Sequence, residues 1–439
     1  MLSLVLLKDG IRTAIPRKLT SRATLGTPTK WDGKAGKRIV EPLHSSFGAA
    51  TQPSIPPLRF AVSTDKRTLM SSALCLPSSV VSEARSDSKV VRQIRPLEDP
   101  RWDEFLTRHP DASLFHSRPW LQALFRTYGY KSLALTTSPV GQPLKNAIVF
   151  CAVESWLTGR RLVSLPFSDH CEPLLDKEDD LKLFADALER ECRNGHWRYV
   201  ELRPLKPFEL ETSLCHATLT YSFHKVDLQP DPNALFRNFH KNSTQRKIRR
   251  AEREGIAYRE GSTESLLDNF YGLFMMTRRR HKLPAPSRTW FRHLMAAFGK
   301  SLQIRIAYQN ERPVAGMVTI RYKDTLVYKY GGSDSRFTNL GGMHLLFWKS
   351  IQEAKESGLN VFDLGRTDLD QSGLITFKSR WGAHQSLLTY SRYSPSGSVT
   401  HLLDLPGRRW KSVVVKHVLA HVQPGVLSAI GRLLYRHVG

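Results

Sequence analysis

The stretch Asp363–Gly382, DLGRTDLDQSGLITFKSRWG, places an acid, an arginine and a lysine within twenty residues, among glycines and aromatic side chains. Few core strands have this composition. Arg366 is suited to hold a phosphate or a carboxylate, because a guanidinium presents two parallel N–H groups to such an anion. A structural ion pair between Asp363 and Arg366 is an equal alternative. The stretch therefore indicates a site that handles charge, without fixing what each residue does.

A second candidate site lies upstream, where a loop containing Arg336 leads into Gly341 and Gly342 at the start of an expected helix. The unpaired N–H groups at a helix start favour anions, and glycines let a ligand approach the backbone closely. Glycine pairs also occur at helix starts for steric reasons alone, so the pattern indicates an anion site only in a supporting context.

Residues 241–255, KNSTQRKIRRAEREG, predict a basic helix with Ser243 as its N-cap and Gly255 past its end. Four of its arginines recur at helical spacing and share one face: Arg246, Arg249, Arg250 and Arg253. That face suits RNA phosphates, as an aminoacyl-tRNA donor requires. The alternative is a solvated face partly paired with neighbouring glutamates.

Taken in order, this helix, FDLGR at 362–366 and FKSRWG at 377–382 resemble the FemAB-related branch of the GNAT acyltransferase superfamily. The resemblance is strongest from residue 241 to 384. The loop LPFSDHCEP resembles the acceptor-side loop of that branch. Residues 336–341 resemble the six-residue acyl-CoA motif of the superfamily, with Asn339 where the motif has glycine. Asparagine tolerates positive φ, so we expect the loop shape to be kept.

The resemblance assigns roles to particular residues. It places Lys378 at the reaction centre, where an ammonium would stabilise the oxyanion of acyl transfer to an amine. Phe377 and Trp381 would exclude water around it, and Tyr330 would take the position of a general acid. Asp169 would orient the acceptor amine or take its proton. The alternatives are a lysine lying over aromatic surface, a core tyrosine, and a surface loop in which the next residue is an ordinary histidine.

Hydrophobic periodicity predicts a mixed α/β (α+β) protein. Expected strands cover 90–97, 131–138, 146–159, 161–167, 197–204, 256–261, 302–333 (three strands), 360–366 and 386–393. Expected helices cover 99–110, 117–129, 176–195, 232–255, 265–282, 287–299 and 341–358. The order helix, helix, β-meander, helix, strand, strand occurs twice. It predicts two tandem GNAT-like domains, each a mixed, mostly antiparallel sheet flanked by helices.

Composition divides the 439 residues into four parts: a disordered basic segment (1–87), an N-terminal GNAT-like domain (88–225), a C-terminal one (226–396) and a basic amphipathic helical tail (397–439). Of the net charge of +25, the third part carries +12 and the second only +1. A basic field attracts nucleic acid, anionic membranes or phosphate-bearing ligands. Five scattered cysteines without CxxC spacing indicate a reducing compartment and neither a disulfide framework nor a zinc site.

The resulting function hypothesis is transfer of an acyl group from acyl-CoA to an amine of a cell-envelope or exopolysaccharide precursor. The acyl-CoA residues would be Arg336, Asn339, Gly341 and Gly342. The substrate-binding residues would be Asp363, Arg366, Phe377 and Trp381. The alternatives are an aminoacyl-tRNA-dependent peptidoglycan-bridge transferase and a non-catalytic basic scaffold. We expect no metal, a small-molecule or lipid-linked acceptor, a cytoplasmic location, and peripheral contact with anionic membrane through 408–439.

Overall fold

The computed structural model describes residues 90–156, 159–176, 179–194, 197–206 and 215–394, together with Tyr435 and His437. The chain divides into two compact units, Met1–Ser86 and Asp87–Gly439, and the described residues all belong to the second unit. The segment expected over 1–87 and most of the tail expected over 397–439 therefore lie outside the described residues.

The first half of the described region runs from β1 to β6. Its elements are β1 (Arg92–Ile94), α3 (Trp102–Arg108), η1 (Leu114–His116), α4 (Arg118–Tyr128), β2 (Lys131–Thr136), β3 (Ile148–Ser155), β4 (Gly159–Val163), α5 (Asp179–Asn194), β5 (Tyr199–Leu202) and β6 (Cys215–Asp227).

The second half repeats this pattern with additional helices. Its elements are α6 (Pro232–Asn238), η2 (Lys241–Gln245), α7 (Arg246–Arg253), β7 (Ala257–Gly261), α8 (Glu264–Arg280), α9 (Arg288–Phe298), η3 (Gly299–Ser301), β8 (Leu302–Gln309), β9 (Arg312–Tyr322), β10 (Thr325–Ser333), η4 (Ser335–Leu340), α10 (Gly342–Glu356), β11 (Val361–Asp368), α11 (Ser372–Ser379) and β12 (His384–Tyr393).

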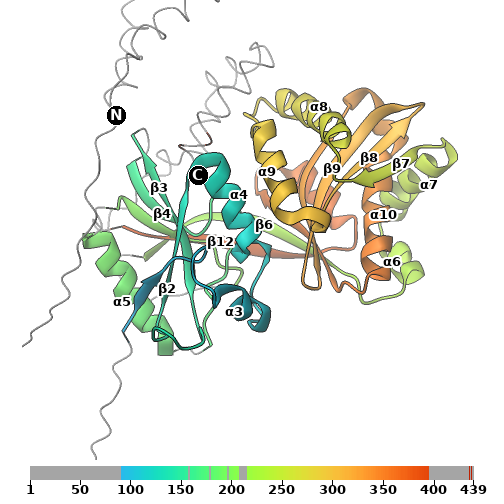
Figure 1. The fold of residues 1–439 in the computed structure, drawn as a ribbon. Coiled ribbons are helices and arrows are strands. Elements are labelled where there is room, and N and C mark those ends of the chain that lie inside the picture. The colour runs from blue at the N-terminus through green and yellow to red at the C-terminus, as the bar shows by residue number, and fades with distance from the viewer. Residues whose placement is uncertain are drawn as a thin grey trace, which may run out of the picture. The chain divides into compact units, whose positions relative to one another are not determined.

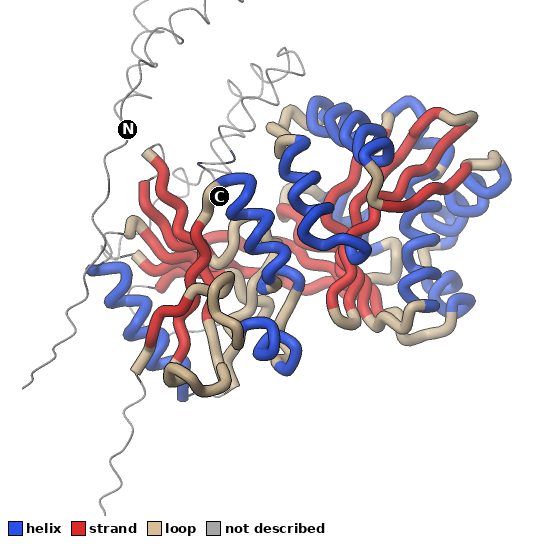
Figure 2. Tube along the Cα trace, viewed as in Figure 1, coloured by secondary structure: helices blue, strands red, loops and turns tan. Residues whose placement is uncertain are grey.

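Twelve strands form one sheet in the order β1-β2-β3-β4-β5-β12-β6-β11-β10-β9-β8-β7. Each half contributes an antiparallel meander followed by one parallel pair, β4 with β5 and β10 with β11. The sheet is thus mixed and mostly antiparallel, with helices against it (Figures 1 and 2). The expected fold class, two tandem GNAT-like domains, is confirmed.

The two halves are joined in the middle of the sheet by an exchange of strands. β12, from the end of the second half, pairs with β5 of the first half as well as with β6. β6 pairs in turn with β11. The boundary expected between residues 225 and 226 falls inside β6, a strand that the periodicity did not predict. Residues on β6, β11 and β12 therefore lie where the halves meet.

Local sequence explains why α4 forms where it does. The Ser117 hydroxyl accepts a hydrogen bond from the Trp120 N–H, a proline occupies the first turn, and Gly129 ends the helix with φ 75°. A serine N-cap, an early proline and a left-handed glycine are the usual signals of helix ends. The expected bounds of this helix are confirmed.

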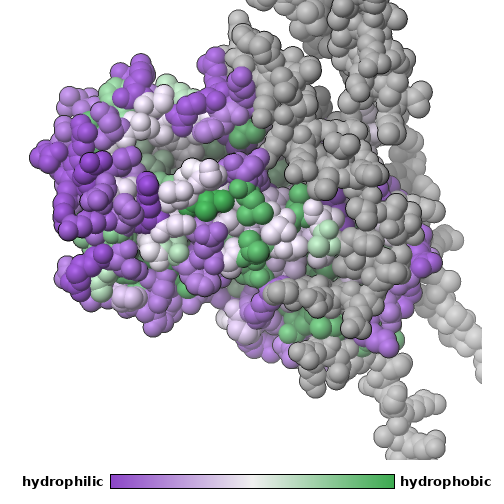
Figure 3. Space-filling model, turned by 180° about the vertical axis from the view of Figure 1, so that it is seen from behind, coloured by the Kyte–Doolittle hydropathy of each residue, from purple (hydrophilic) through white to green (hydrophobic). Residues whose placement is uncertain are grey.

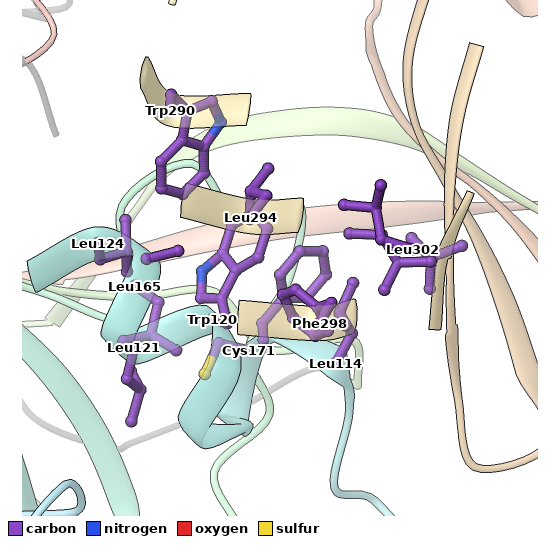
Figure 4. Close-up of a cluster of buried hydrophobic side chains, with 14 of the residues drawn as sticks. Leu114, Trp120, Leu121, Leu124, Leu165, Cys171, Trp290, Leu294, Phe298 and Leu302 are labelled. Atoms are coloured by element: carbon purple, nitrogen blue, oxygen red, sulfur yellow. The ribbon is translucent and has the colours of Figure 1, made fainter. Parts of the chain in front are cut away.

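A shared hydrophobic core holds the halves together (Figure 4). The Trp120 ring of α4 packs edge-to-face against Trp290 of α9, with centroids 5.4 Å apart. Such pairs add about 1 kcal/mol to the burial of the rings themselves. The Thr127 hydroxyl and His293 Nδ1 are hydrogen bonded at 2.8 Å between the same two helices. The junction is therefore packed rather than a loose hinge.

Candidate active site

The site begins where two parallel strands stop pairing. The register of β10 with β11 runs from Thr325 opposite Val361 to Val327 opposite Asp363 and ends there. The register of β10 shifts after Tyr328, and that of β11 shifts after Asp363. The strand ends beyond these irregularities are therefore free to face other groups, which is a common use of β-bulges near active sites.

The first half supplies the loop that faces this gap. After β4, Leu165 and Phe167 adopt φ of 60° and 61°, which is unfavourable for residues with a side chain. The Tyr390 hydroxyl donates a 2.6 Å hydrogen bond to the Asp169 carbonyl oxygen and fixes the loop against β12. Backbone strain of this kind clusters at functional sites. It holds Asp169 against the second half.

Asp169 binds two cations of the second half. Lys329 Nζ lies 2.8 Å from Asp169 Oδ2, and Arg366 Nε lies 3.7 Å from Oδ1. Burial alone would raise the pKa of Asp169, but the charges of Lys329 and Arg366 outweigh it and hold that pKa below its usual value. Burial lowers the pKa of Lys329, against the attraction of Asp169. The carboxylate is therefore ionised and fixed.

Asp363 and Arg366 do not form the expected alternative ion pair. Asp363 Oδ1 accepts the Gly365 N–H at 2.7 Å, and Oδ2 lies 3.2 Å from His170 Nε2. Arg366 instead stacks its guanidinium over Tyr221, 4.1 Å from the ring centroid. Arg366 Nη1 is buried and has no hydrogen-bond partner within the described structure.

Lys378 lies near the end of α11. Its ammonium donates to the carbonyl oxygens of Gly365, at 2.8 Å, and Arg366, at 3.1 Å. The residue is 3% exposed. Burial lowers its pKa to about 8, partly opposed by Asp169 and Asp363. The lysine is thus fixed beside the strand end that also carries Arg366.

In and around α11 a charged side chain is buried and apolar side chains are exposed, which is the opposite of the usual arrangement. The lysine is buried, while three nearby leucines in the sequence are exposed: Leu369 before α11 (51%), Leu374 within it (39%) and Leu387 in β12 (63%). Buried lysines without a functional or structural partner are rare in proteins. In the view from behind, apolar side chains gather near the middle of the face, beside the hydrophilic outer surface of the second half (Figure 3).

Phe377 and Trp381 hold the helix rather than frame the ammonium. Trp381 stacks on Phe347 and meets Phe239 edge-to-face, with centroids 5.1 and 5.0 Å apart. Phe377 packs against His344 and Phe347. Both rings thus pack against Phe347, whereas the Lys378 ammonium donates to the backbone carbonyls of β11. The expected aromatic frame is therefore a core contact that positions α11.

Tyr330 does not face the gap as a free acid. Its hydroxyl accepts a 2.8 Å hydrogen bond from Trp290 Nε1, inside a cluster with Phe274 and Phe291. Burial raises the pKa of this hydroxyl above its usual value. This environment fits the alternative of a core tyrosine better than that of a general acid.

The loop at residues 336–341 does not have the shape expected of an acyl-CoA site. Arg336 forms a bidentate pair with Asp334, with Nη2 2.6 Å from Oδ2, and points to solvent. Asn339 lies in η4 and does not have positive φ. Gly341 does, at 81°, but a Cβ there would lie 2.2 Å from the Lys247 carbonyl oxygen. Thus α7 covers the start of α10, where Gly342 is buried.

A basic groove lies next to this covered helix start. This basic groove is a depression of about 760 Å³ between α7 and η4. It is lined by Lys241, Asn242, Arg246, Lys247, Arg249, Arg250, Arg253, Thr338 and Asn339. The four arginines expected to share one face all line it. No acidic residue does, although Glu254 pairs with Arg250 at 3.4 Å.

Sequence reasoning missed two residues of the site. Lys329 was not singled out, although a lysine between two tyrosines inside a buried strand is unusual. His170 was taken for a surface-loop histidine, yet it is 4% exposed and hydrogen bonded to Asp363. Its burial depends on contacts with the other half of the chain, so no local signal predicts it.

Residues 238–378 match the family described as Acetyltransferase (GNAT) domain. The chain is 24% identical over 168 residues to the UDP-N-acetylmuramoylpentapeptide-lysine N(6)-alanyltransferase of Weissella viridescens. That match covers 37% of this chain and 50% of the relative. The chain carries a FemAB-related GNAT domain. The matched range includes Lys329, Asp363, Arg366 and Lys378, whereas the Asp169 loop, Tyr221 of β6 and Tyr390 of β12 lie outside it.

The fold as a whole is similar to the crystal structure of FemX, with a TM-score of 0.55. The likeness covers 68% of this chain and 96% of that chain at 13% identity, and it therefore concerns the fold alone. It includes both halves, in agreement with the tandem architecture. The aligned part of the alanyltransferase amounts to about half of that protein's length.

The described residues contain no group of histidine, cysteine and acidic side chains able to hold a metal ion. Among them, no helix is long and apolar enough to cross a membrane. Within the tail, Tyr435 is described: its hydroxyl bonds to Arg278, and its carbonyl accepts from Tyr130. Membrane contact through 408–439 remains a prediction.

Proposed function

We propose that the chain transfers an aminoacyl group to the amine of a peptide acceptor, in the gap between β10 and β11. One observation carries the proposal. A buried ammonium, that of Lys378, is fixed beside the strand end that carries Arg366, whose Nη1 has no partner among the described residues. The match of residues 238–378 to acetyltransferase domains supports the same chemistry.

In this proposal Lys378 stabilises the transition state. The lone pair of the acceptor amine attacks the carbonyl carbon of the donor ester, and the carbonyl oxygen becomes an oxyanion. A fixed ammonium next to that oxygen is worth about 3 kcal/mol, or 10²- to 10³-fold in rate. The C–O bond to the donor then breaks, its oxygen takes a proton, and the amine loses one. Asp169 attracts and orients the amine, and Arg366 binds a substrate oxygen.

The donor we propose is an aminoacyl-tRNA. The basic groove offers six cations and no carboxylate in its lining, and three of its arginines are exposed: Arg246, Arg249 and Arg253. A row of arginines along a helix suits a phosphate backbone, and such binding weakens steeply with salt. The alanyl transfer named for the Weissella viridescens relative agrees with an aminoacyl donor.

The acceptor we propose is a lysine-type amine on a peptidoglycan peptide precursor. The name of the relative specifies a lysine N6 within a UDP-N-acetylmuramoylpentapeptide. Such an acceptor combines an amine with a peptide and can be nucleotide- or lipid-linked.

Acyl-CoA is the second candidate donor. Thr338 and Asn339, which precede the left-handed Gly341 at the start of α10, line the same groove as the arginines. A pyrophosphate in the groove would thus meet part of the expected motif. Against it, Arg336 is engaged by Asp334, and the Lys247 carbonyl lies against Gly341.

The test is a transfer assay on the full chain with a lysine-containing peptide and labelled donors. We expect label to move from aminoacyl-tRNA, to stop after RNase treatment, and to fall at least tenfold in Arg246→Glu/Arg253→Glu. Lys131→Glu/Lys300→Glu, which changes the charge equally at two exposed positions outside the groove, is the matched control. If label moves from acetyl-CoA alone and RNase has no effect, the donor is acyl-CoA and not aminoacyl-tRNA. Absence of transfer from either would favour a non-catalytic scaffold.

A further inference from the structure

The loop that carries Asp169 is braced by a buried arginine of the first half. Leu165 and Phe167 have positive φ in this loop, a conformation that persists only where surrounding groups fix it. Arg203, which is 6% exposed, supplies such support. Its Nη1 donates to the carbonyl oxygens of Leu165, at 2.7 Å, and Ser168, at 3.2 Å. One guanidinium therefore holds the backbone immediately before Asp169.

Arg203 is held in turn by a buried ion network that joins the two halves. Glu201, on β5, accepts two hydrogen bonds from Arg203 through Oε1, at 2.9 and 2.8 Å. Through Oε2 it accepts two from Arg392, on β12, at 2.8 and 2.6 Å. Burial alone would raise the pKa of Glu201, but the charges of Arg392 and Arg203 outweigh it and lower that pKa to about 2. The carboxylate is therefore ionised at neutral pH, and the paired hydrogen bonds fix the orientation of Arg203.

Tyr390 of β12 contacts both members of the ion pair between Asp169 and Arg366. Its hydroxyl donates to the Asp169 carbonyl oxygen at 2.6 Å. The centroid of its ring lies 5.2 Å from the Arg366 guanidinium and 4.9 Å from the Tyr221 ring, on which that guanidinium also stacks. Guanidinium groups are attracted to aromatic faces at such distances. One side chain thus restrains the backbone of the anion and the side chain of the cation.

The Tyr390 hydroxyl is not placed for proton transfer to a substrate. Its proton is directed at the Asp169 carbonyl oxygen, and burial raises the pKa of the hydroxyl above its usual value. The hydroxyl is therefore a neutral hydrogen-bond donor at neutral pH. The same ring lies 4.9 Å from the Arg203 guanidinium, so the brace of the loop and the two charged groups of the site meet at this residue.

We propose that Tyr390 is a positioning residue that sets both charged groups of the proposed active site. Its hydroxyl sets the position of Asp169, its ring sets that of Arg366, and Arg203 braces the Asp169 loop. The proposal rests on the proposed function only in the roles given to Asp169, which orients the acceptor amine, and Arg366, which binds a substrate oxygen. The two contacts are separable, because phenylalanine keeps the ring and removes the hydroxyl, whereas leucine removes both.

The first test measures the loop itself and needs no transfer activity. Hydrogen exchange of the full chain, followed by mass spectrometry, reports the loop amides that are hydrogen bonded within residues 163–168. We expect Tyr390→Phe to speed exchange in a peptide covering 164–170 about fivefold, because local opening becomes easier. Tyr271→Phe is the matched control, since its hydroxyl also donates to a backbone carbonyl, that of Pro286 at 3.2 Å. Equal exchange in the two variants overturns the proposal.

The second test separates positioning from structural support by steady-state transfer to the lysine-containing peptide. We expect Tyr390→Phe to raise the acceptor KM about tenfold and to leave kcat nearly unchanged, because only Asp169 is released. Tyr390→Leu should also lower kcat about tenfold, because Arg366 loses its ring contact. Arg203→Lys keeps the charge but lacks the fork of donors, so it should reproduce the KM of Tyr390→Phe. If Tyr390→Phe lowers the temperature of thermal unfolding but leaves KM unchanged, the residue is structural only and the proposal is overturned.

The two measurements distinguish failure of this proposal from failure of the proposed function. If exchange rises in Tyr390→Phe but the wild-type chain transfers no label from any donor, the positioning of the loop stands and the proposed function fails. If the wild-type chain transfers label and Tyr390→Phe matches it in both exchange and KM, the function stands and the positioning role fails.

Discussion

Replacement of Lys378 by methionine separates catalysis from stability. The ammonium is 3% exposed, and burial lowers its pKa from 10.5 to about 8. At about 1.4 kcal/mol per pKa unit, charge burial costs the folded state about 3 kcal/mol at neutral pH. Methionine removes that cost but leaves the Gly365 and Arg366 carbonyls without their donor, at about 1–2 kcal/mol each. We therefore expect a net change in unfolding free energy below about 2 kcal/mol.

The same variant should lose 10²- to 10³-fold in kcat, because the oxyanion loses its ammonium. Its stability should also have a different pH dependence. In the wild-type chain, folded Lys378 releases its proton at about pH 8 and the unfolded residue at about 10.5. The unfolded state thus binds more protons in this window, so this group adds stability as pH rises. Lys378→Met lacks that gain.

Urea unfolding at pH 7 and pH 9.5, with single-turnover kinetics at pH 7, measures both effects. Lys300→Met, at an exposed position, is the control and should change neither. A kcat within fivefold of wild type would refute the catalytic role of Lys378. An unfolding free energy that changes equally with pH in Lys378→Met and wild type would refute the lowered pKa.

Three further outcomes are expected. Because Lys329 and Arg366 depress the pKa of Asp169, its stabilisation is present above the unfolded pKa and disappears as pH falls through the folded pKa. In acid unfolding, Asp169→Asn should therefore lose less stability than wild type between pH 5 and pH 2. The variant should also raise the acceptor KM. An acid transition that matches wild type would contradict this reasoning. Gly365→Ala and Gly358→Ala share the cost of positive φ, about 1 kcal/mol, but only the first places a Cβ 3.1 Å from Asp169 Oδ2. Transfer should therefore fall in Gly365→Ala alone. Equal kcat in both variants would show that crowding of Asp169 does not affect transfer. Tyr330→Phe should lower unfolding free energy by about 1 kcal/mol through the lost bond from Trp290 and leave kcat within threefold, whereas a hundredfold loss would restore the general-acid role.

Features set by neighbouring residues were predictable from the sequence. The ends of α4 follow from Ser117 and Gly129, and the arginine face of α7 follows from helical spacing. The FDLGR and FKSRWG segments lie next to each other, because the Lys378 ammonium donates to the carbonyls of Gly365 and Arg366. The prediction succeeded where the determining contacts lie within a few residues.

Features set by contacts between the halves were not predictable in the same way. β6 has a polar alternating sequence, CHATLTYSFHKVD, and becomes a central strand only because β11 and β12 cover its edges. Asp363 bonds to His170, and Arg366 lies against Asp169 and Tyr221, so the two residues do not pair with each other. Gly373, an unfavourable residue within a helix, lies in the first turn of α11, which is held by the packing of Trp381. In each case a residue far along the chain decides the local outcome.

The most direct test of the account is the single-turnover transfer rate of the full wild-type chain between pH 6 and pH 10. An alkoxyamine peptide should serve as acceptor, because it stays unprotonated throughout and adds no ionisation of its own. If the Lys378 ammonium stabilises the oxyanion, the rate is constant at low pH and falls tenfold per pH unit above about pH 8, where the ammonium loses its proton. A rate that rises through pH 8, or that does not change across the range, would contradict the central role given to this ammonium.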